Sequence, residues 1–120
     1  MRYLAVLKGN AVSEAGYVPT EEDMAGMGAF IDQAMQAGWL LATEGLLPSA
    51  RATRVALSAG QRTVTDGPFT ESKELIASYA LMQVDSREEA IEHTWSFLDM
   101  LGEGEVELWP VFEVEAPHAG

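Results

Sequence analysis

Residues 75–84, LIASYALMQV, constrain the fold of this 120-residue chain more than any other stretch. A run of this length, rich in apolar residues and free of Gly and Pro, is typical of a β-strand. Successive side chains of a strand point to opposite faces of its sheet. Both faces of this strand are apolar, one carrying Ala77, Tyr79 and Leu81 and the other Ala80, Met82 and Val84. The sheet therefore needs a cover on each side.

Two helices are predicted from capping signals and apolar periodicity. Thr20 precedes three acidic residues and opens the first helix, which Gly38 ends. Ser86 and Glu89 form a capping box for the second helix. The apolar stripes expected to face the core are Met24, Met27, Ile31, Ala34 and Met35 in the first helix, and Ile91, Trp95, Leu98 and Leu101 in the second.

Further strands are expected at residues 2–8, 40–47 and 106–114, with a hairpin formed by residues 51–57 and 61–65. The resulting order, β-α-β-(hairpin)-β-α-β, predicts an α+β fold with a ferredoxin-like sheet and both helices on one face. We expect a single domain over residues 1–120, with an ordered core at 1–115 and a tail at 116–120.

The sheet face that the helices leave open predicts self-association. A broad apolar face is sticky on a monomer, whereas a two-fold partner that packs sheet to sheet covers it. We therefore expect a homodimer. Pro110 interrupts the last strand, and because proline cannot donate a ladder hydrogen bond, that strand is expected at a sheet edge or with a bulge.

Composition narrows the functional classes. The formal net charge of −12, from 19 acidic and seven basic residues, repels nucleic-acid phosphates and anionic membranes. No apolar run approaches the ~18 residues of a membrane span, and the chain has no cysteine, so we expect a soluble cytoplasmic protein. His93 and His118 lie far apart and no nucleotide or metal motif occurs, so we expect neither a metal site nor a cofactor.

Three carboxylates are candidates for acid–base chemistry. Asp66 opens a turn over residues 66–68 and either acts as a general base or holds its own loop. Glu44 interrupts an apolar strand, so it lies either at a strand end in water or in a cleft that suits proton abstraction. Glu71 either takes part in catalysis, pairs with a nearby lysine or caps a turn.

Four more side chains are candidates for ligand binding. Arg54 suits a ligand carboxylate, but it equally suits the protein's own acids or an acidic strip on a dimer partner. Lys73 either contacts a ligand or lies at the surface, and Phe69 either contacts a ligand or anchors its loop in the core. Tyr79 either directs its hydroxyl into a cleft or packs in the interior.

Asp66-Gly67-Pro68-Phe69, followed by Glu71 and Lys73-Glu74, resembles the signature of the DGPF branch of the YciI-like (YCII-related) proteins. Other segments match the family in the same order along the chain. These are Tyr3-Leu4, Glu44-Gly45-Leu46 with Pro48, Asp85-Ser86 with Glu89-Ala90, and Glu105-Val106-Glu107 with Pro110-Val111. The resemblance spans nearly the whole chain.

The resemblance implies a dimeric α+β barrel and no established reaction. A histidine–aspartate pair has been proposed as catalytic in YciI itself, but no histidine lies between Thr20 and Gly38 of this chain. Ala77-Ser78-Tyr79 stands where the family commonly has Gly-Gly-Tyr. Trp109 stands where relatives tend to place an arginine, so an anion anchor at that position is missing here.

Two functions of different classes follow. One is a cofactor-independent small-molecule enzyme, of isomerase or lyase type, that uses carboxylate acid–base chemistry. The other is a non-catalytic dimeric module that senses a ligand or docks a regulatory protein such as a sigma factor. The second rests on the resemblance, since similar proteins are thought to be encoded beside sigma factors or fused to them.

Overall fold

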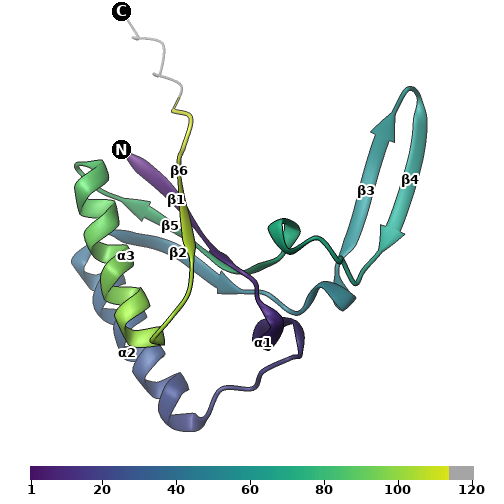
Figure 1. Ribbon diagram of the computed structural model, residues 1–120. Helices are drawn as coiled ribbons and strands as arrows, with labels where there is room; N and C mark the ends of the chain where they lie inside the picture. The colour runs from purple at the N-terminus through teal and green to yellow at the C-terminus, as the bar shows by residue number, and fades with distance from the viewer. Residues whose placement is uncertain (114–120) are drawn as a thin grey trace, which may run out of the picture.

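The computed structural model describes residues 1–113, apart from the side chain of Ser72 (Figure 1). Within these residues, six strands, three α-helices and two short 3₁₀ turns follow one another. Their bounds are β1 (Arg2–Lys8), α1 (Ala11–Glu14), α2 (Glu21–Ala37), β2 (Leu40–Gly45), η1 (Ser49–Arg51), β3 (Thr53–Ser58), β4 (Gln61–Asp66), η2 (Ser72–Glu74), β5 (Ile76–Gln83), α3 (Arg87–Leu101) and β6 (Val106–Pro110).

Four strands form an antiparallel sheet in the order β2-β5-β1-β6. Helices α2 and α3 lie together on one face of this sheet (Figure 1), which confirms the predicted α+β, ferredoxin-like arrangement. Strand β6 lies at the sheet edge, as Pro110 indicated. That strand ends at Pro110, short of the predicted end, and Val114 lies outside the described residues.

The helix ends follow the capping signals of the sequence. The Thr20 hydroxyl accepts a hydrogen bond from the backbone N–H of Asp23 at 3.1 Å, and Gly38 ends α2 in the left-handed region at φ +88°. The Ser86 hydroxyl accepts a bond from the Glu89 N–H at 3.1 Å. Each cap acts within a few residues of its own helix, which is why the sequence alone located both helices.

The predicted apolar stripes are partly wrong. Met24, Met35 and Trp95 are 57%, 44% and 57% exposed. Helix α2 instead turns the row of Met27, Phe30, Ile31 and Ala34 toward the sheet, and α3 turns the row of Ala90, Thr94, Phe97 and Leu101. Small residues decide this rotation, because Ala90 and Ala34 are buried at 0% and 3% exposure and permit close approach to the sheet.

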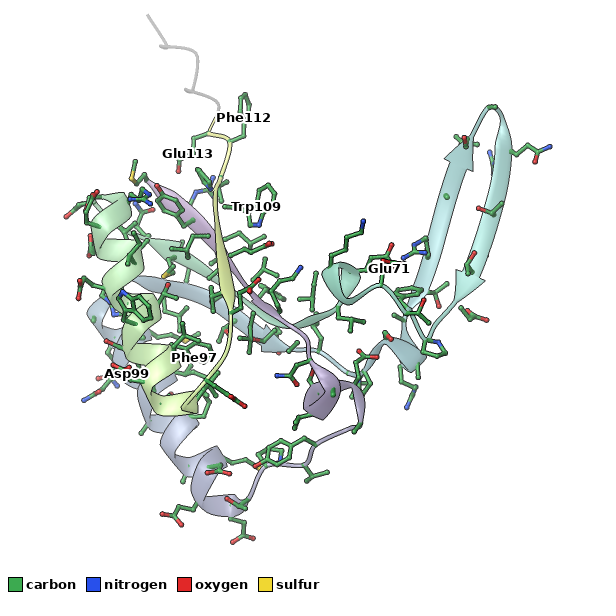
Figure 2. All side chains as sticks on the ribbon, in the orientation of Figure 1. Glu71, Phe97, Asp99, Trp109, Phe112 and Glu113 are labelled. Carbon is green, nitrogen blue, oxygen red and sulfur yellow. The ribbon has the colours of Figure 1, made fainter. Side chains whose placement is uncertain are left out.

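The core is small and lies at one end of the sheet. Its centre combines Tyr3 of β1 and Met82 of β5 with Val84 and Ala90. Phe97 lies on the helix side of the sheet, whereas Trp109 projects from β6 away from α3 (Figure 2). The face of the sheet opposite α2 and α3, called the outer face below, therefore carries the second apolar set that the sequence indicated.

Strands β3 and β4 form a separate two-stranded sheet rather than joining the main one. Every residue of both strands is exposed. This hairpin, called the arm below, projects away from the sheet on the side opposite the helices (Figure 1).

Candidate functional site

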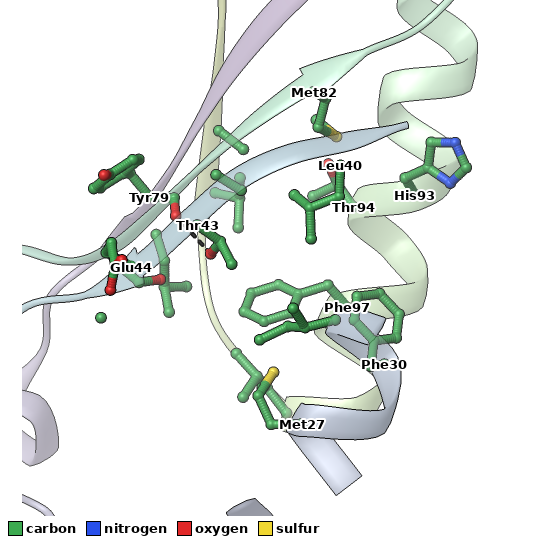
Figure 3. A pocket seen from close by; sticks show the side chains of 18 of the residues that line it. Met27, Phe30, Leu40, Thr43, Glu44, Tyr79, Met82, His93, Thr94 and Phe97 are labelled. Atoms are coloured by element: carbon green, nitrogen blue, oxygen red, sulfur yellow. Dashed lines mark hydrogen bonds between the residues drawn. The ribbon is translucent and has the colours of Figure 1, made fainter. Parts of the chain in front are cut away.

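A cavity of about 380 Å³ lies between the helix side of the sheet and helices α2 and α3 (Figure 3). Its wall is predominantly apolar, with contributions from all four strands of the main sheet and from both helices. The main contributors are Ala5, Leu7, Met27, Phe30, Ile31, Trp39, Leu40, Ala80, Met82, Phe97, Leu101 and Val106. Of the site residues named from the sequence, Glu44 and Tyr79 border this cavity and the other five do not, because the cavity is assembled from residues in six separate elements.

Few polar groups reach the cavity. The Thr43 hydroxyl donates to the Tyr79 carbonyl at 2.8 Å, and the Thr94 hydroxyl donates to the Ala90 carbonyl at 2.8 Å. Each hydroxyl uses its O–H to donate a hydrogen bond to the backbone. Toward a ligand its oxygen can therefore act only as an acceptor, through its lone pairs. A ligand that is mostly apolar and carries a donor suits this lining.

His93 lies at the end of the cavity beside Trp39, the residue just before β2. Its ring stacks on the indole of Trp39, with ring centroids 3.8 Å apart and planes inclined by 6°. Its Nε2 lies 3.5 Å from Glu89 Oε1, and this nitrogen is buried without a hydrogen-bond partner among the described residues. The histidine therefore packs against the cavity wall.

Glu44 borders the opposite end of the cavity, together with Gly45 and Ser78. It is exposed and lies next to the last residue of β2, which ends at Gly45, earlier than predicted. In the strand register Glu44 faces Tyr79, whereas Thr43 faces Ala80. Alternation along the strand thus places the Glu44 side chain beside Tyr79 on the outer face, at the rim of the cavity rather than within it.

Asp66 and Glu71 do not join Glu44 at the cavity. The Asp66 carboxylate accepts a hydrogen bond from the Thr53 hydroxyl on the paired strand at 3.2 Å. This bond links the two strands at the base of the arm. Asp66 thus has a structural contact, with the neighbouring strand rather than with its own loop. Glu71 is exposed in the turn that precedes η2. The three candidate carboxylates are thus distributed over separate elements.

The Asp66–Phe69 loop packs closely against η1 and Ala52, and this contact is called the joint below. Gly67 donates its N–H to the Ala52 carbonyl at 2.9 Å, and the Gly67–Pro68 peptide bond is cis. A Cβ at position 67 would lie only 1.7 Å from the carbonyl oxygen of Ser49. Glycine is required here because another backbone segment occupies the space of a side chain.

Ser49 is the centre of this joint and is only 8% exposed. Its hydroxyl accepts a bond from the Phe69 N–H at 2.9 Å and donates to Glu14 Oε2 at 2.6 Å. The Ser49 N–H donates to Glu14 Oε1 at 3.0 Å. Three segments far apart in the sequence meet at one side chain, so the sequence gave no signal for either Ser49 or Glu14.

Two of the candidate ligand-binding residues near the joint, Arg54 and Phe69, contact each other within the chain. The Arg54 guanidinium lies 4.2 Å from the centroid of the Phe69 ring and bonds Glu74 Oε2 at 2.8 Å. Phe69 is half-buried beneath it. Lys73 is exposed, and its carbonyl accepts a bond from Lys8 Nζ at 2.8 Å. Arg54 therefore takes the intrachain alternative raised by the sequence.

We expect Ser49→Ala to lower the free energy of unfolding by about 1–2 kcal/mol, because it leaves a partly buried Glu14 carboxylate oxygen and the Phe69 N–H without their partner. Denaturant unfolding followed by tryptophan fluorescence measures the change at a fixed protein concentration. Ser96→Ala is the control, since Ser96 is exposed on α3 and its loss should alter stability by less than about 0.5 kcal/mol. Equal effects of the two variants would contradict a structural role for Ser49.

Sheet, helices and cavity together define a small α+β domain of the ferredoxin-like type. The family model of the YCII-related domain matches residues 1–114 of the chain. The chain is also 34% identical over 91 residues to an uncharacterised protein of Rhizobium meliloti (strain 1021), with 73% of each protein covered. This protein therefore belongs to the YCII-related family.

Among solved structures, 5-chloro-2-hydroxyhydroquinone dehydrochlorinase (TftG) from Burkholderia phenoliruptrix AC1100, in complex with 2,5-dihydroxybenzoquinone, resembles the chain at 17% sequence identity. The match covers 92% of this chain and 94% of that one, with a TM-score of 0.47. Within residues 1–113, no helix is long and apolar enough to cross a membrane.

Proposed function

We propose that this protein binds an apolar small molecule in the cavity between the sheet and helices α2 and α3. The cavity itself carries the proposal, because its volume of about 380 Å³ lies within the ~300–1,000 Å³ typical of small-molecule sites. The rings of Phe30, Phe97 and Trp39 line it, which favours a ligand with an aromatic or aliphatic body. The hydroxyl oxygens of Thr43 and Thr94 supply acceptors that orient such a ligand.

We expect Ala80→Phe to weaken binding of the neutral fluorophore N-phenyl-1-naphthylamine by roughly tenfold or more. Ala80 lies on the cavity wall in the centre of β5, so the added ring occupies space that the fluorophore needs. Fluorescence titration measures the affinity. Circular dichroism checks that the variant keeps its fold.

The same exchange at Ala29, which is exposed on α2, is the matched control and should leave the affinity unchanged. Saturable binding to the wild type that both variants retain equally would place the fluorophore outside the cavity. Absence of saturable binding to the wild type would contradict the proposal as a whole.

A second candidate function is cofactor-independent isomerisation or elimination, and the position of Glu44 at the rim of this cavity favours it. A general base must come within ~3 Å of the proton that it removes. Because the Glu44 side chain lies beside Tyr79 on the outer face, it reaches only the part of a ligand that extends past the end of β2. A substrate with an apolar body in the cavity and an acidic C–H at its exposed end meets this condition.

A further inference from the structure

Glu44 and Tyr79 form a cross-strand pair at the rim of the cavity. They lie directly opposite each other in the register of β2 and β5, and both border the cavity. Figure 3 shows the two at one end of the cavity, with Phe30 and Phe97 toward the other end. Directly opposite residues of an antiparallel pair have Cβ atoms about 4.5–5.5 Å apart. A carboxylate and a phenol hydroxyl at this spacing can approach neighbouring atoms of one small molecule.

Hydrogen bonds on either side of the pair fix its position. The Thr43 hydroxyl, on the cavity wall, donates to the Tyr79 carbonyl at 2.8 Å. Beyond the end of β2, the Leu46 N–H donates to the Ala77 carbonyl at 2.9 Å. The chain therefore stays bonded to β5 on both sides of Glu44. Side chains carried by a paired strand are placed more precisely than side chains on a loop.

The polar groups of the pair are not used by the rest of the structure. Within residues 1–113, Glu44 takes part in none of the ion pairs. The Tyr79 hydroxyl makes no hydrogen bond within the same residues, unlike the hydroxyl of Tyr17, which donates to Asp23 at 3.1 Å. The pair therefore offers a substrate one proton acceptor and one O–H donor.

The charge around the cavity disfavours anionic substrates. Among the described residues, those that line the cavity include no Lys or Arg, and the whole chain carries a net charge of −12. A substrate carboxylate or phosphate would meet Glu44 with no cation to hold it. A neutral carbonyl group suits the pair better, because Tyr79 can donate to its oxygen while Glu44 accepts a proton from the adjacent carbon.

We propose that the substrate is a neutral, apolar ketone, which Glu44 and Tyr79 enolise together. This inference rests on the second function proposed above, and it adds the substrate class and a second catalytic residue. The apolar body of the ketone lies in the cavity. Its carbonyl end emerges past the end of β2, between the two side chains.

The enolisation needs no co-reactant. The Glu44 carboxylate removes a proton from the carbon next to the carbonyl, and the electron pair of that C–H bond forms a C=C bond. The π pair of the carbonyl moves to its oxygen, which accepts a hydrogen bond from the Tyr79 O–H. Glu44, now a carboxylic acid, returns a proton either to the same carbon or to the far end of a conjugated double bond. The first outcome exchanges hydrogen with the solvent, and the second isomerises the ketone.

Hydrogen–deuterium exchange of 2-tetralone, an apolar bicyclic ketone, tests the role of Tyr79. Mass spectrometry in D₂O measures how fast the ketone gains mass with and without the protein. We expect the wild type to accelerate the exchange and Tyr79→Phe to lower its kcat by about 10²–10³-fold, as expected for the loss of one donor to the enolate oxygen. Tyr17→Phe is the matched control, since it removes a phenol hydroxyl before α2 and should leave the rate unchanged.

Binding of 2-naphthol, which resembles the enol of 2-tetralone, separates a catalytic role of Tyr79 from a structural one. We expect Tyr79→Phe to weaken 2-naphthol binding by about tenfold or more, because the oxygen loses its donor. The affinity for N-phenyl-1-naphthylamine, which has no oxygen, should stay unchanged. Circular dichroism checks that the variant keeps its fold. Equal weakening for both compounds would indicate a distorted cavity and overturn the catalytic role.

The outcomes separate this inference from the binding function. A Tyr79→Phe variant that exchanges 2-tetralone as fast as the wild type would overturn the role of Tyr79, even if Glu44→Gln were inactive. A wild type that binds both naphthalene compounds but does not exchange 2-tetralone would overturn the enolisation and leave the binding function in place. A wild type that binds neither compound would overturn both proposals.

Discussion

Replacing Gly67 with alanine is expected to lower the free energy of unfolding by about 3 kcal/mol or more, or to prevent folding of the joint altogether. A Cβ at this position would meet the Ser49 carbonyl oxygen at 1.7 Å, and a backbone atom cannot move aside as the end of a flexible side chain can. Relief of the clash must separate the Asp66–Phe69 loop from η1. That movement breaks the bond from the Gly67 N–H to the Ala52 carbonyl and weakens the bond from the Phe69 N–H to Ser49.

Chemical denaturation at a fixed protein concentration measures this effect. Gly26→Ala is the control, because nothing lies within 4 Å of a Cβ built at Gly26 in the interior of α2. Alanine there should stabilise the protein by about 0.5–1 kcal/mol, since it restricts the unfolded chain and favours the helix. A Gly67→Ala variant as stable as the wild type would show that the joint is not close-packed in solution.

Glu44→Gln is expected to slow proton transfer by about 10²–10⁴-fold if the cavity is a catalytic site. Glutamine keeps the size of the side chain and removes its ability to accept a proton, so binding should change little while the chemical step is lost. Native mass spectrometry of the freshly purified protein identifies any ligand that it retains. Incubating that ligand with the protein in D₂O and measuring its gain in mass then reports the removal and return of a C–H proton.

Glu71→Gln is the matched control, because Glu71 is an exposed carboxylate in a separate turn and should leave the exchange rate unchanged. Asp66→Asn distinguishes a second base from the structural role that its bond to Thr53 indicates. Equal exchange with the wild type and with Glu44→Gln would remove Glu44 as the base. No exchange with the wild type, combined with tight binding, would favour a ligand-sensing protein over an enzyme.

Local signals of the sequence located most of the secondary structure. The caps at Thr20 and Ser86 each join groups three residues apart, and the apolar run of residues 75–84 located the strand at the centre of the sheet. Helix α1 was missed. Its cap joins Asn10 and Ser13, but the helix is too short to show an apolar period.

The Asp66–Phe69 segment shows what a sequence motif can and cannot predict about the role of its residues. In the sequence it is the segment that resembles a family signature, and the close contact between Gly67 and Ser49 gives a physical reason for its glycine. The sequence could not indicate whether the residues of this turn serve a reaction or hold two segments of the chain together. The partners that answer this question, Ser49 and Glu14, are 18 and 53 positions away from Gly67 in the numbering of the chain.

By itself, then, the sequence determined the order of the main strands and the two long helices, because each depends on neighbours within one strand, turn or helix, and from that order it predicted the ferredoxin-like sheet and the family. The tertiary structure decided which rows of α2 and α3 face the sheet, where the cavity lies, and that the arm stands apart with both of its faces exposed. These features depend on contacts between distant segments. Small residues such as Ala90 and Gly67 set the closest of those contacts, and their hydrophobicity carries no signal of that role.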